Sequence, residues 1–301
     1  MDRSIVVTGA TGRQGGAVVE HLLRSSGSFR VRALTRNPNS VRSRGLAERG
    51  VDVVAGNLND RESLDRALAG AYGVFAVQNF WEHGPDAEVR QGKLLGNAAK
   101  AAGIAHFVYT SVGAAERNTG VTHYETKWQI EEYLRELSLP LTVLRPVFFM
   151  DLFNDPKYPA PAAWSLLASA LGNEKKLQMV AVDDIGSVAA LAFARPDEYI
   201  GQAVELAGDE LTIPQAAAAY RNIVGRSPCY LSIPTWPVGL LNRHAGIGIR
   251  WLRAEGWHTN IAQARARHPN LHTFERWLLS QKIGQTSKRR KRSNPTKLLQ
   301  G

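Results

Sequence analysis

Cysteine is almost absent from this sequence, since Cys229 is the only one among 301 residues. A single thiol cannot form an intrachain disulfide, and it excludes a zinc site built from clustered cysteines. The sequence also lacks an apolar run long enough to cross a bilayer. The first strand-like run starts at Ser4, which leaves no space ahead of it for a signal or transit peptide. We therefore expect a cytoplasmic protein that needs neither a metal nor a membrane.

Acidic residues are missing from the C-terminal stretch 282–301, which contains seven lysines and arginines. The whole chain has a net charge of +10, but residues 1–281 account for only +3 of it. The high isoelectric point belongs mainly to this tail, so we do not expect direct nucleic-acid binding by the folded body. The run Lys288–Arg292 is typical of a solvated tail, although it could also bind a polyanion or serve nuclear entry in a eukaryotic cell.

Strand and helix patterns alternate through the first 150 residues. The expected strands are Ile5–Thr8, Phe29–Thr35, Val51–Ala55, Tyr72–Val77, His106–Ser111 and Leu141–Arg145. The expected helices are Ala17–Leu23, a helix from the N-cap Asp60 to Ala69, Ala87–Ala102 and Tyr124–Leu137. Alternation at this spacing predicts right-handed βαβ units. The fold class is therefore α/β, a doubly wound Rossmann sheet, with residues 1–150 as the nucleotide-binding domain.

The regular alternation ends after Pro146. A strand is expected at Val180–Val182, then a helix to Ala194 capped by Asp183 or Asp184. A short strand at Val204–Leu206 and a helix Pro214–Val224 capped by Thr212 follow. We assign residues 151–283 to a smaller substrate or partner lobe, which could return to the sheet. Residues 284–301 are expected to be a disordered basic tail.

The clearest local motif is GATGRQGG, residues Gly9–Gly16, between an expected strand and an expected helix. Its spacing is G-x-x-G-x-x-G. Glycines allow a tight turn and a close approach of the backbone to a pyrophosphate, whose charge is favoured at a helix N-terminus. A turn without a ligand is the plainer interpretation, but the position and the four glycines favour a dinucleotide site.

The residues after the second strand indicate which dinucleotide. No acid lies between Ser25 and Glu48, where an NAD site usually has a carboxylate for the ribose hydroxyls. Arg36 stands there instead and can pair with a 2′-phosphate, and Arg13 could face the same phosphate. The sequence therefore predicts NADP(H) in preference to NAD(H).

Four sequence blocks carry a resemblance to the NmrA-like family, an atypical branch of the short-chain dehydrogenases. They are TGATGRQGG at residues 8–16, TRNP at residues 35–38, NFWE at residues 79–82 with QGKLL at residues 91–95, and HYETK at residues 123–127 followed by EEYL at residues 131–134. The likeness covers most of residues 4–225. Within that family the sequence is most similar to the NADPH-sensor proteins of the HSCARG type.

This resemblance implies a set of cofactor contacts. The set comprises Gly9, Ala10, Thr11, Gly12, Arg13, Gln14 and Gly15 at the pyrophosphate, Arg36 at the 2′-phosphate, Asn57 and Leu58 at the adenine, Gln78, Asn79 and Phe80 at the ribose and nicotinamide, Lys93 and Lys127 at riboses or phosphate, and Phe148, Phe149, Met150 and Asp151 over the nicotinamide. Two positions depart from the family pattern. Asn57 stands where the family usually has an aspartate. The sensor members often have a basic residue near the position of Ser40, and Arg42 could replace it at the 2′-phosphate.

Catalysis in ordinary short-chain dehydrogenases uses a tyrosine, a lysine four residues later and a serine at the end of the fifth strand. Ser111 and Lys127 match the serine and the lysine, but the tyrosine position holds His123. Tyr124, three residues before Lys127, is displaced by one position and can still share its helix face. Tyr124 could therefore act as a proton donor or could be aromatic packing.

Two functions from different classes follow from these observations. The first is an NADP(H)-binding redox sensor that reports to a regulatory protein partner. The second is an NADPH-dependent oxidoreductase acting on a quinone or a small carbonyl, for which Phe80, Trp81, Phe148, Phe149, Phe153 and Trp164 could line a pocket. The displaced tyrosine favours the sensor, and the retained Ser111, Tyr124 and Lys127 keep the enzyme open. Either protein could form a homodimer.

Overall fold

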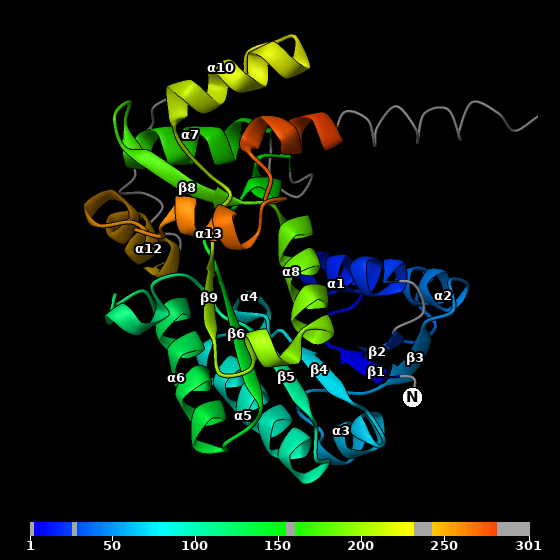
Figure 1. Cartoon of the computed structure of the whole chain (residues 1–301). Coiled ribbons are helices and arrows are strands. Elements are labelled where there is room, and N and C mark those ends of the chain that lie inside the picture. The colour runs from blue at the N-terminus through cyan, green and yellow to red at the C-terminus, as the bar shows by residue number, and fades with distance from the viewer. Residues whose placement is uncertain (1–2, 26–28, 155–159, 232–242, 282–301) are drawn as a thin grey trace, which may run out of the picture.

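The computed structural model describes residues 3–25, 29–154, 160–231 and 243–281. Its main sheet has seven parallel strands: β1 (Arg3–Val7), β2 (Phe29–Thr35), β3 (Asp52–Ala55), β4 (Gly73–Ala76), β5 (His106–Thr110), β6 (Leu141–Pro146) and β9 (Ala203–Leu206). Their order is β3-β2-β1-β4-β5-β6-β9 (Figure 1). The expected α/β doubly wound sheet is confirmed. Every strand predicted in residues 1–150 is present.

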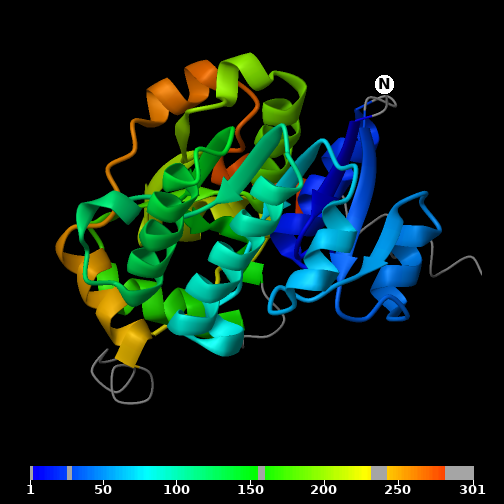
Figure 2. The same cartoon turned by 90° about the horizontal axis from the view of Figure 1, so that it is seen from below.

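Helices cover both faces of this sheet (Figure 2). One face carries α1 (Arg13–Arg24), α2 (Val41–Ala47) and α8 (Val182–Ala194), and the other carries α3 (Arg61–Leu68), α5 (Pro85–Ala101) and α6 (Thr122–Glu136). Strand β1 shows the cause. Ile5 and Val7 pack into the core under α1 and α8, whereas Val6 packs under α3 and α5, and all three are fully buried. Alternate residues of a strand point to opposite faces, so an apolar run suits a sheet covered on both sides.

The chain leaves this sheet after β6 and builds a second one. It comprises β7 (Phe148–Phe149), β8 (Lys176–Val180) and β10 (Asp209–Thr212) in the order β10-β8-β7. Around it lie α7 (Ala160–Leu171), α10 (Ile213–Val224), α12 (Arg243–Ala254), α13 (Ile261–Arg267) and a helix over residues 274–281. Trp164, Phe274 and Trp277 are buried in the core of this lobe.

Four short helical segments connect the larger elements. They are α4 (Phe80–His83), η1 (Ala115–Arg117), η2 (Met150–Asn154) and α9 (Pro196–Tyr199).

Two expectations for the C-terminal half need correction. The strand expected at Val180–Val182 is β8 at Lys176–Val180, and α8 begins at Val182 with Ala181 as its N-cap. The two aspartates in the first turn of α8 make other contacts. Asp183 pairs with His21 at 3.0 Å, and Asp184 pairs with His272 at 2.6 Å. Those partners are distant in sequence, so a local capping rule could not find them.

The N-cap Thr212 is confirmed. Its hydroxyl accepts a hydrogen bond from the Gln215 amide, and the Gln215 side chain accepts one from the Thr212 amide in return.

The crossing of α1 and α8 connects the two halves of the chain. Helix α8 follows β8 of the second sheet, packs on α1, and leads to β9, which pairs with β6 in the main sheet. Gly186 makes the crossing close, because a Cβ there would lie 2.6 Å from the carbonyl carbon of Ala17. The loop before α1 is therefore held in place by residues far along the sequence.

We predict that Gly186→Ala destabilises the protein by roughly 1–3 kcal/mol, because overpacking at the crossing outweighs the helix propensity gained. The control is Gly45→Ala in α2, where a Cβ would meet nothing within 4 Å. It should be neutral or stabilising by about 0.5–1 kcal/mol. Urea unfolding measures both. Equal stability of the two variants would contradict the close crossing.

Candidate functional site

The glycine loop follows β1 at the carboxyl edge of the main sheet. Thr8 ties it to the segment after β4, since its hydroxyl donates to the Val77 carbonyl at 3.0 Å and accepts from the Val77 amide at 2.8 Å. Gly9 has a φ of +60°, and the Gly12 amide donates to the Gly9 carbonyl at 2.8 Å. A Cβ at Gly15 would lie 2.3 Å from that same carbonyl oxygen. The turn therefore requires glycine at Gly9 and at Gly15.

The N-terminus of α1 is suited to an anion. Its N-cap is Gly12, without a side-chain cap, and the first turn contains no acid. The first amide groups of a helix have no intrahelical partner, and the helix dipole favours negative charge there. In the same turn Gln14 accepts a hydrogen bond from the Thr110 hydroxyl at 2.7 Å, which joins α1 to the end of β5. This cradle fits the pyrophosphate of a dinucleotide.

Arg36, at the end of β2, already has partners. One terminal nitrogen lies 2.6 Å from the Glu82 carboxylate, and the other lies 3.4 Å from Nε2 of His83. Hydrogen bonding to Arg36 is the main cause that lowers the pKa of Glu82. Both partners belong to α4, whose N-cap Asn79 accepts from the Trp81 amide at 3.2 Å. Sequence reasoning missed Glu82, although it stands in the block NFWE.

Arg42 lies beside the glycine loop. Its guanidinium donates to the Thr11 carbonyl at 3.3 Å from the first turn of α2. Ser40 caps α2 by accepting from the Ser43 amide at 3.1 Å, so its hydroxyl serves the helix. The loop after β3 is also held internally, because the Asn57 amide donates to the Ser63 hydroxyl at 3.0 Å. Leu58 packs against the core under α3. Arg42 is thus a cation held directly against the glycine loop.

Buried polar groups without a partner mark the ends of β4 and β5. Gln78 and Ser111 are each only 5% exposed. Neither Nε2 nor Oε1 of the Gln78 side chain has a hydrogen-bond partner among the described residues, and the Ser111 hydroxyl has none there either. Such groups are rare in folded proteins, because each loses its bonds to water on burial. Their position, at the carboxyl edge beside the glycine loop, fits a polar ligand.

Lys127 on α6 forms a buried ion pair that the sequence did not indicate. Its ammonium lies 2.8 Å from the carboxylate of Glu88 on α5, and it donates to the Gln78 carbonyl at 3.4 Å. The Thr126 hydroxyl donates to the same carboxylate at 2.5 Å. Glu88 is fully buried, and the Lys127 side chain is only 12% exposed. Lys127 is therefore fixed under the strand ends, with the ring of Tyr109 5.6 Å away.

Tyr124 belongs to an aromatic cluster. Its ring centroid lies 4.6 Å from that of His123, 5.1 Å from that of Trp251 and 6.3 Å from that of Trp257. Burial raises the pKa of Tyr124 far above its usual range. Among the described residues, no hydrogen bond joins its hydroxyl to Lys127 or Ser111. The three groups expected to act together are thus not joined in this structure.

His123 and Phe80 extend the same cluster towards α4. The ring centroids of Phe80 and His123 are 5.6 Å apart, and Phe80 lies 5.3 Å from His244 on α12. Burial, together with the charges of Lys127 and His244, lowers the pKa of His123 to about 4. His123 is therefore neutral at physiological pH and is a poor proton donor there.

Residues Phe148 to Asp151 lie where the chain passes from β6 to the second lobe. Met150 is fully buried in the core of that lobe. Asp151 accepts from the Val182 amide at 2.8 Å, at the start of α8, and burial raises its pKa. Phe149 contacts the core under α1, and Phe148 stacks edge-on against Phe153 at 5.7 Å. These side chains connect α8 to the edge of the main sheet.

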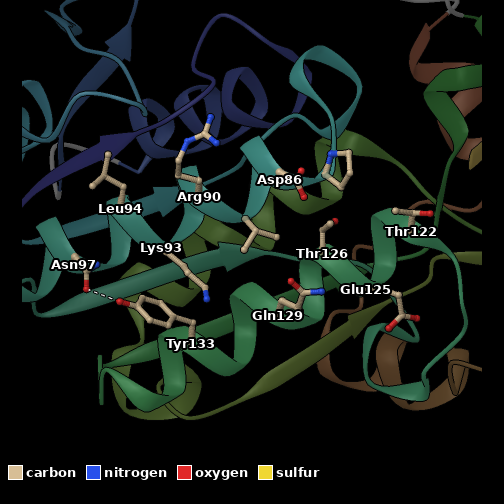
Figure 3. Close-up of a pocket in the computed structure, with 12 residues that line it drawn as sticks. Asp86, Arg90, Lys93, Leu94, Asn97, Thr122, Glu125, Thr126, Gln129 and Tyr133 are labelled. Carbon is tan, nitrogen blue, oxygen red and sulfur yellow. Dashed lines mark hydrogen bonds between the residues drawn. The ribbon is translucent and has the colours of Figure 1, made fainter.

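Lys93 lies in an outer groove between α5 and α6 (Figure 3). The groove has a volume of about 740 Å³, and the Lys93 ammonium lies 4.8 Å from the Tyr133 ring centroid. Lys93 is thus exposed on the outer side of α5, whereas Lys127 contacts the Gln78 carbonyl after β4. Within the described ranges no cluster of three or more metal-binding side chains occurs, and no helix has the length and apolarity to span a membrane.

We predict that Gly12→Val abolishes dinucleotide binding and leaves the fold intact. Gly12 has φ −92° and ψ −169°, an extended conformation that valine adopts readily. A Cβ would make a tight contact of 3.1 Å with the Gly9 carbonyl oxygen, which a loop shift of a few tenths of an ångström relieves. The side chain would then fill the space in front of the α1 amides. Titration with NADPH and thermal unfolding check this. Normal binding by the folded variant would show that the loop holds no pyrophosphate.

We further predict that Lys127→Met destabilises the protein by roughly 3–5 kcal/mol, because it leaves the Glu88 carboxylate buried without a counter-charge. The double variant Glu88→Gln with Lys127→Met should recover most of that loss. Urea unfolding of the single and double variants provides the measurement. If Lys127→Met matched the unsubstituted protein, the ion pair would not be a structural element.

The sequence matches a known protein family. The sequence profile of the NmrA-like family matches residues 1–239. The NmrA-like family domain-containing oxidoreductase FrzB of Cladobotryum sp is 28% identical over 259 residues, 77% of each chain. A second such oxidoreductase, ptmS of Penicillium ochrochloron, is 29% identical over 256 residues, 77% of this chain and 76% of its own.

Solved structures show the same fold. The triphenylmethane reductase of Citrobacter sp. complexed with NADP(H) has a TM-score of 0.75 and 21% identity, over 92% of this chain and 99% of its own. NmrA, a negative transcriptional regulator solved with NAD, has a TM-score of 0.74 and 20% identity, over 92% and 94%. The quinone oxidoreductase QOR2 of Escherichia coli complexed with NADPH has a TM-score of 0.75 and 21% identity, over 91% of this chain and 98% of its own. With a profile match across most of its length, this chain belongs to the NmrA-like family.

Proposed function

We propose that this protein binds NADP(H) in the glycine loop and reports cofactor level or redox state to a protein partner. The observation that carries the proposal is the uncapped N-terminus of α1 beside two buried, unpartnered polar side chains, Gln78 and Ser111. The relatives support a nicotinamide cofactor, since structures of the same fold contain NADP(H), NADPH or NAD.

The side chains around the loop suit the parts of such a cofactor. The amides after Gly12 would hold the pyrophosphate, and Arg36 and Arg42 would face the 2′-phosphate. Gln78 and Ser111 could bond the ribose or the carboxamide, and Lys127 lies under them, held by Glu88. When bound, NADPH supplies a hydride at this end of the site.

The regulatory role follows from the state of the proton donors. Tyr124 is buried against Trp251, its pKa is raised, and Lys127 is engaged by Glu88 rather than by the tyrosine hydroxyl. General acid catalysis needs a donor within hydrogen-bond reach and a pKa near the working pH. This arrangement favours binding over rapid turnover.

A second candidate is an NADPH-dependent oxidoreductase acting on a quinone or a small carbonyl. The unpartnered hydroxyl of Ser111 at the end of β5 favours it, because that hydroxyl could bond an acceptor oxygen. Relatives named oxidoreductases and the quinone oxidoreductase fold support the same candidate. Hydride transfer to a quinone does not need a fixed acid at Tyr124.

The deciding experiment combines a binding titration with a turnover assay. We expect saturable NADPH binding, tighter than NADH, and slow or absent NADPH oxidation with a panel of quinones and aldehydes. Arg36→Ala should remove most of the preference, about threefold to tenfold given that this arginine is 60% exposed. Tyr124→Phe should leave cofactor affinity unchanged.

Two outcomes would contradict the proposal. Absence of NADPH binding would remove the cofactor from the account. Fast oxidation of NADPH with any acceptor would replace the sensor by the enzyme, and the Tyr124→Phe variant would then show whether the tyrosine donates the proton, since loss of a general acid costs about 10²–10⁴-fold in rate.

A further inference from the structure

The structure brings a carboxylate to the place where the sequence has none. No acid follows β2 before Glu48, yet Glu82 of α4 lies 2.6 Å from the Arg36 guanidinium. A carboxylate near the end of the second strand is the group that holds the ribose hydroxyls in sites that prefer NAD. Here that carboxylate comes from the helix after β4, a segment forty-six positions further along the chain.

The contacts of Arg36 show what a 2′-phosphate would meet. Glu82 occupies one terminal nitrogen, and His83 lies 3.4 Å from the other. Arginine has five N–H groups, so a phosphate could bond those that remain, but a two-pronged bond would bring it close to the Glu82 carboxylate on the same guanidinium. A phosphate monoester carries a charge of about −1.5 to −2 at neutral pH, and it would also be repelled by the Glu82 carboxylate.

We propose that Glu82 determines cofactor specificity: it competes with the 2′-phosphate of NADP(H) for Arg36 and accepts a hydrogen bond from the 2′-hydroxyl of NAD(H). The Arg36–Glu82 pair therefore reduces the preference for NADP(H) that Arg36 alone would give. This inference rests on the proposed function, because it requires a nicotinamide dinucleotide in the glycine loop.

The place of α4 gives the competition a structural consequence. Glu82 is two residues from Phe80, which packs on His123 at 5.6 Å and on His244 at 5.3 Å. Release of Glu82 by a 2′-phosphate would remove one of the two contacts that join this four-residue helix to Arg36, the other being His83.

The test is a pair of equilibrium titrations, with NADPH and with NADH, on the full chain and on Glu82→Gln. Glutamine keeps the size and removes the charge. We expect NADPH to bind about two- to fivefold more tightly and NADH about two- to threefold more weakly, in line with an exposed ion pair. The control is Glu136→Gln at the exposed end of α6, which should change neither affinity.

The background variant Arg36→Ala isolates the competition. In that background there is no guanidinium to compete for, so Glu82→Gln should tighten NADPH binding only by relieving charge repulsion. The gain in affinity should therefore be much smaller than in the chain that keeps Arg36. Thermal unfolding of each variant confirms that the differences do not come from misfolding.

Three results would overturn the inference. Weaker NADPH binding by Glu82→Gln would mean that Glu82 orients Arg36 for the phosphate. Unchanged affinities for both cofactors would mean that the carboxylate is irrelevant to recognition. If the unsubstituted protein bound neither cofactor, the proposed function would fail and this inference with it, a result distinct from the other two.

Discussion

The backbone contact between Gly15 and the Gly9 carbonyl oxygen fixes the position of α1, and the candidate site is built around that helix. A Cβ at Gly15 would lie 2.3 Å from this oxygen, so only glycine lets the helix begin so close to β1. Thr8 then joins the loop to Val77, and Gln14 joins it to Thr110 on β5. The amides of α1, the end of β4 and the end of β5 are thereby gathered at one edge of the sheet. Helix α8 holds the other side of α1 through the crossing at Gly186.

Arg36 and Lys127, the two cations proposed to contact the cofactor, each have a carboxylate partner. Both partners come from the segment after β4. Arg36 pairs with Glu82 of α4, and Lys127 pairs with Glu88 of α5. The pairs differ in kind. The Arg36 side chain is 60% exposed, so a competing anion can displace Glu82 at small cost, whereas Glu88 is fully buried and keeps Lys127 in place. Under the proposed function, cofactor binding would exchange the partner of Arg36 at one end of the site and would leave Lys127 in its fixed position at the other.

The parts of this site that local sequence patterns define could be predicted from the sequence. Strand and helix periodicity predicted the six strands of residues 1–150 in the main sheet and the helices α1, α3, α5 and α6, but it missed α2 and the short α4. The glycine spacing located the loop before α1, because that signal depends on neighbours in the chain. The resemblance to the NmrA-like family is confirmed, while the likeness to its HSCARG-type members stays a prediction. Glu82, Glu88 and the Trp251 contact of Tyr124 could not be predicted, because each depends on a tertiary approach between distant segments. The position of Lys93 could not be predicted either. It belongs to one of the sequence blocks shared with the family, and in the structure it lines the outer groove between α5 and α6.

The central claim, that NADP(H) binds with its pyrophosphate at α1 and its 2′-phosphate beside Arg36, is tested most directly by phosphorus NMR of NADP⁺ titrated with the protein. The cofactor carries three phosphorus nuclei, two in the pyrophosphate and one in the 2′-phosphate, and the signals of the two groups are well separated. The account predicts that the pyrophosphate signals and the 2′-phosphate signal all shift on binding, and that the pKa of the 2′-phosphate falls because a guanidinium stabilises its dianion. A 2′-phosphate signal that keeps its free position and pKa while the pyrophosphate signals move would contradict the role of Arg36. No change in any signal would contradict cofactor binding itself.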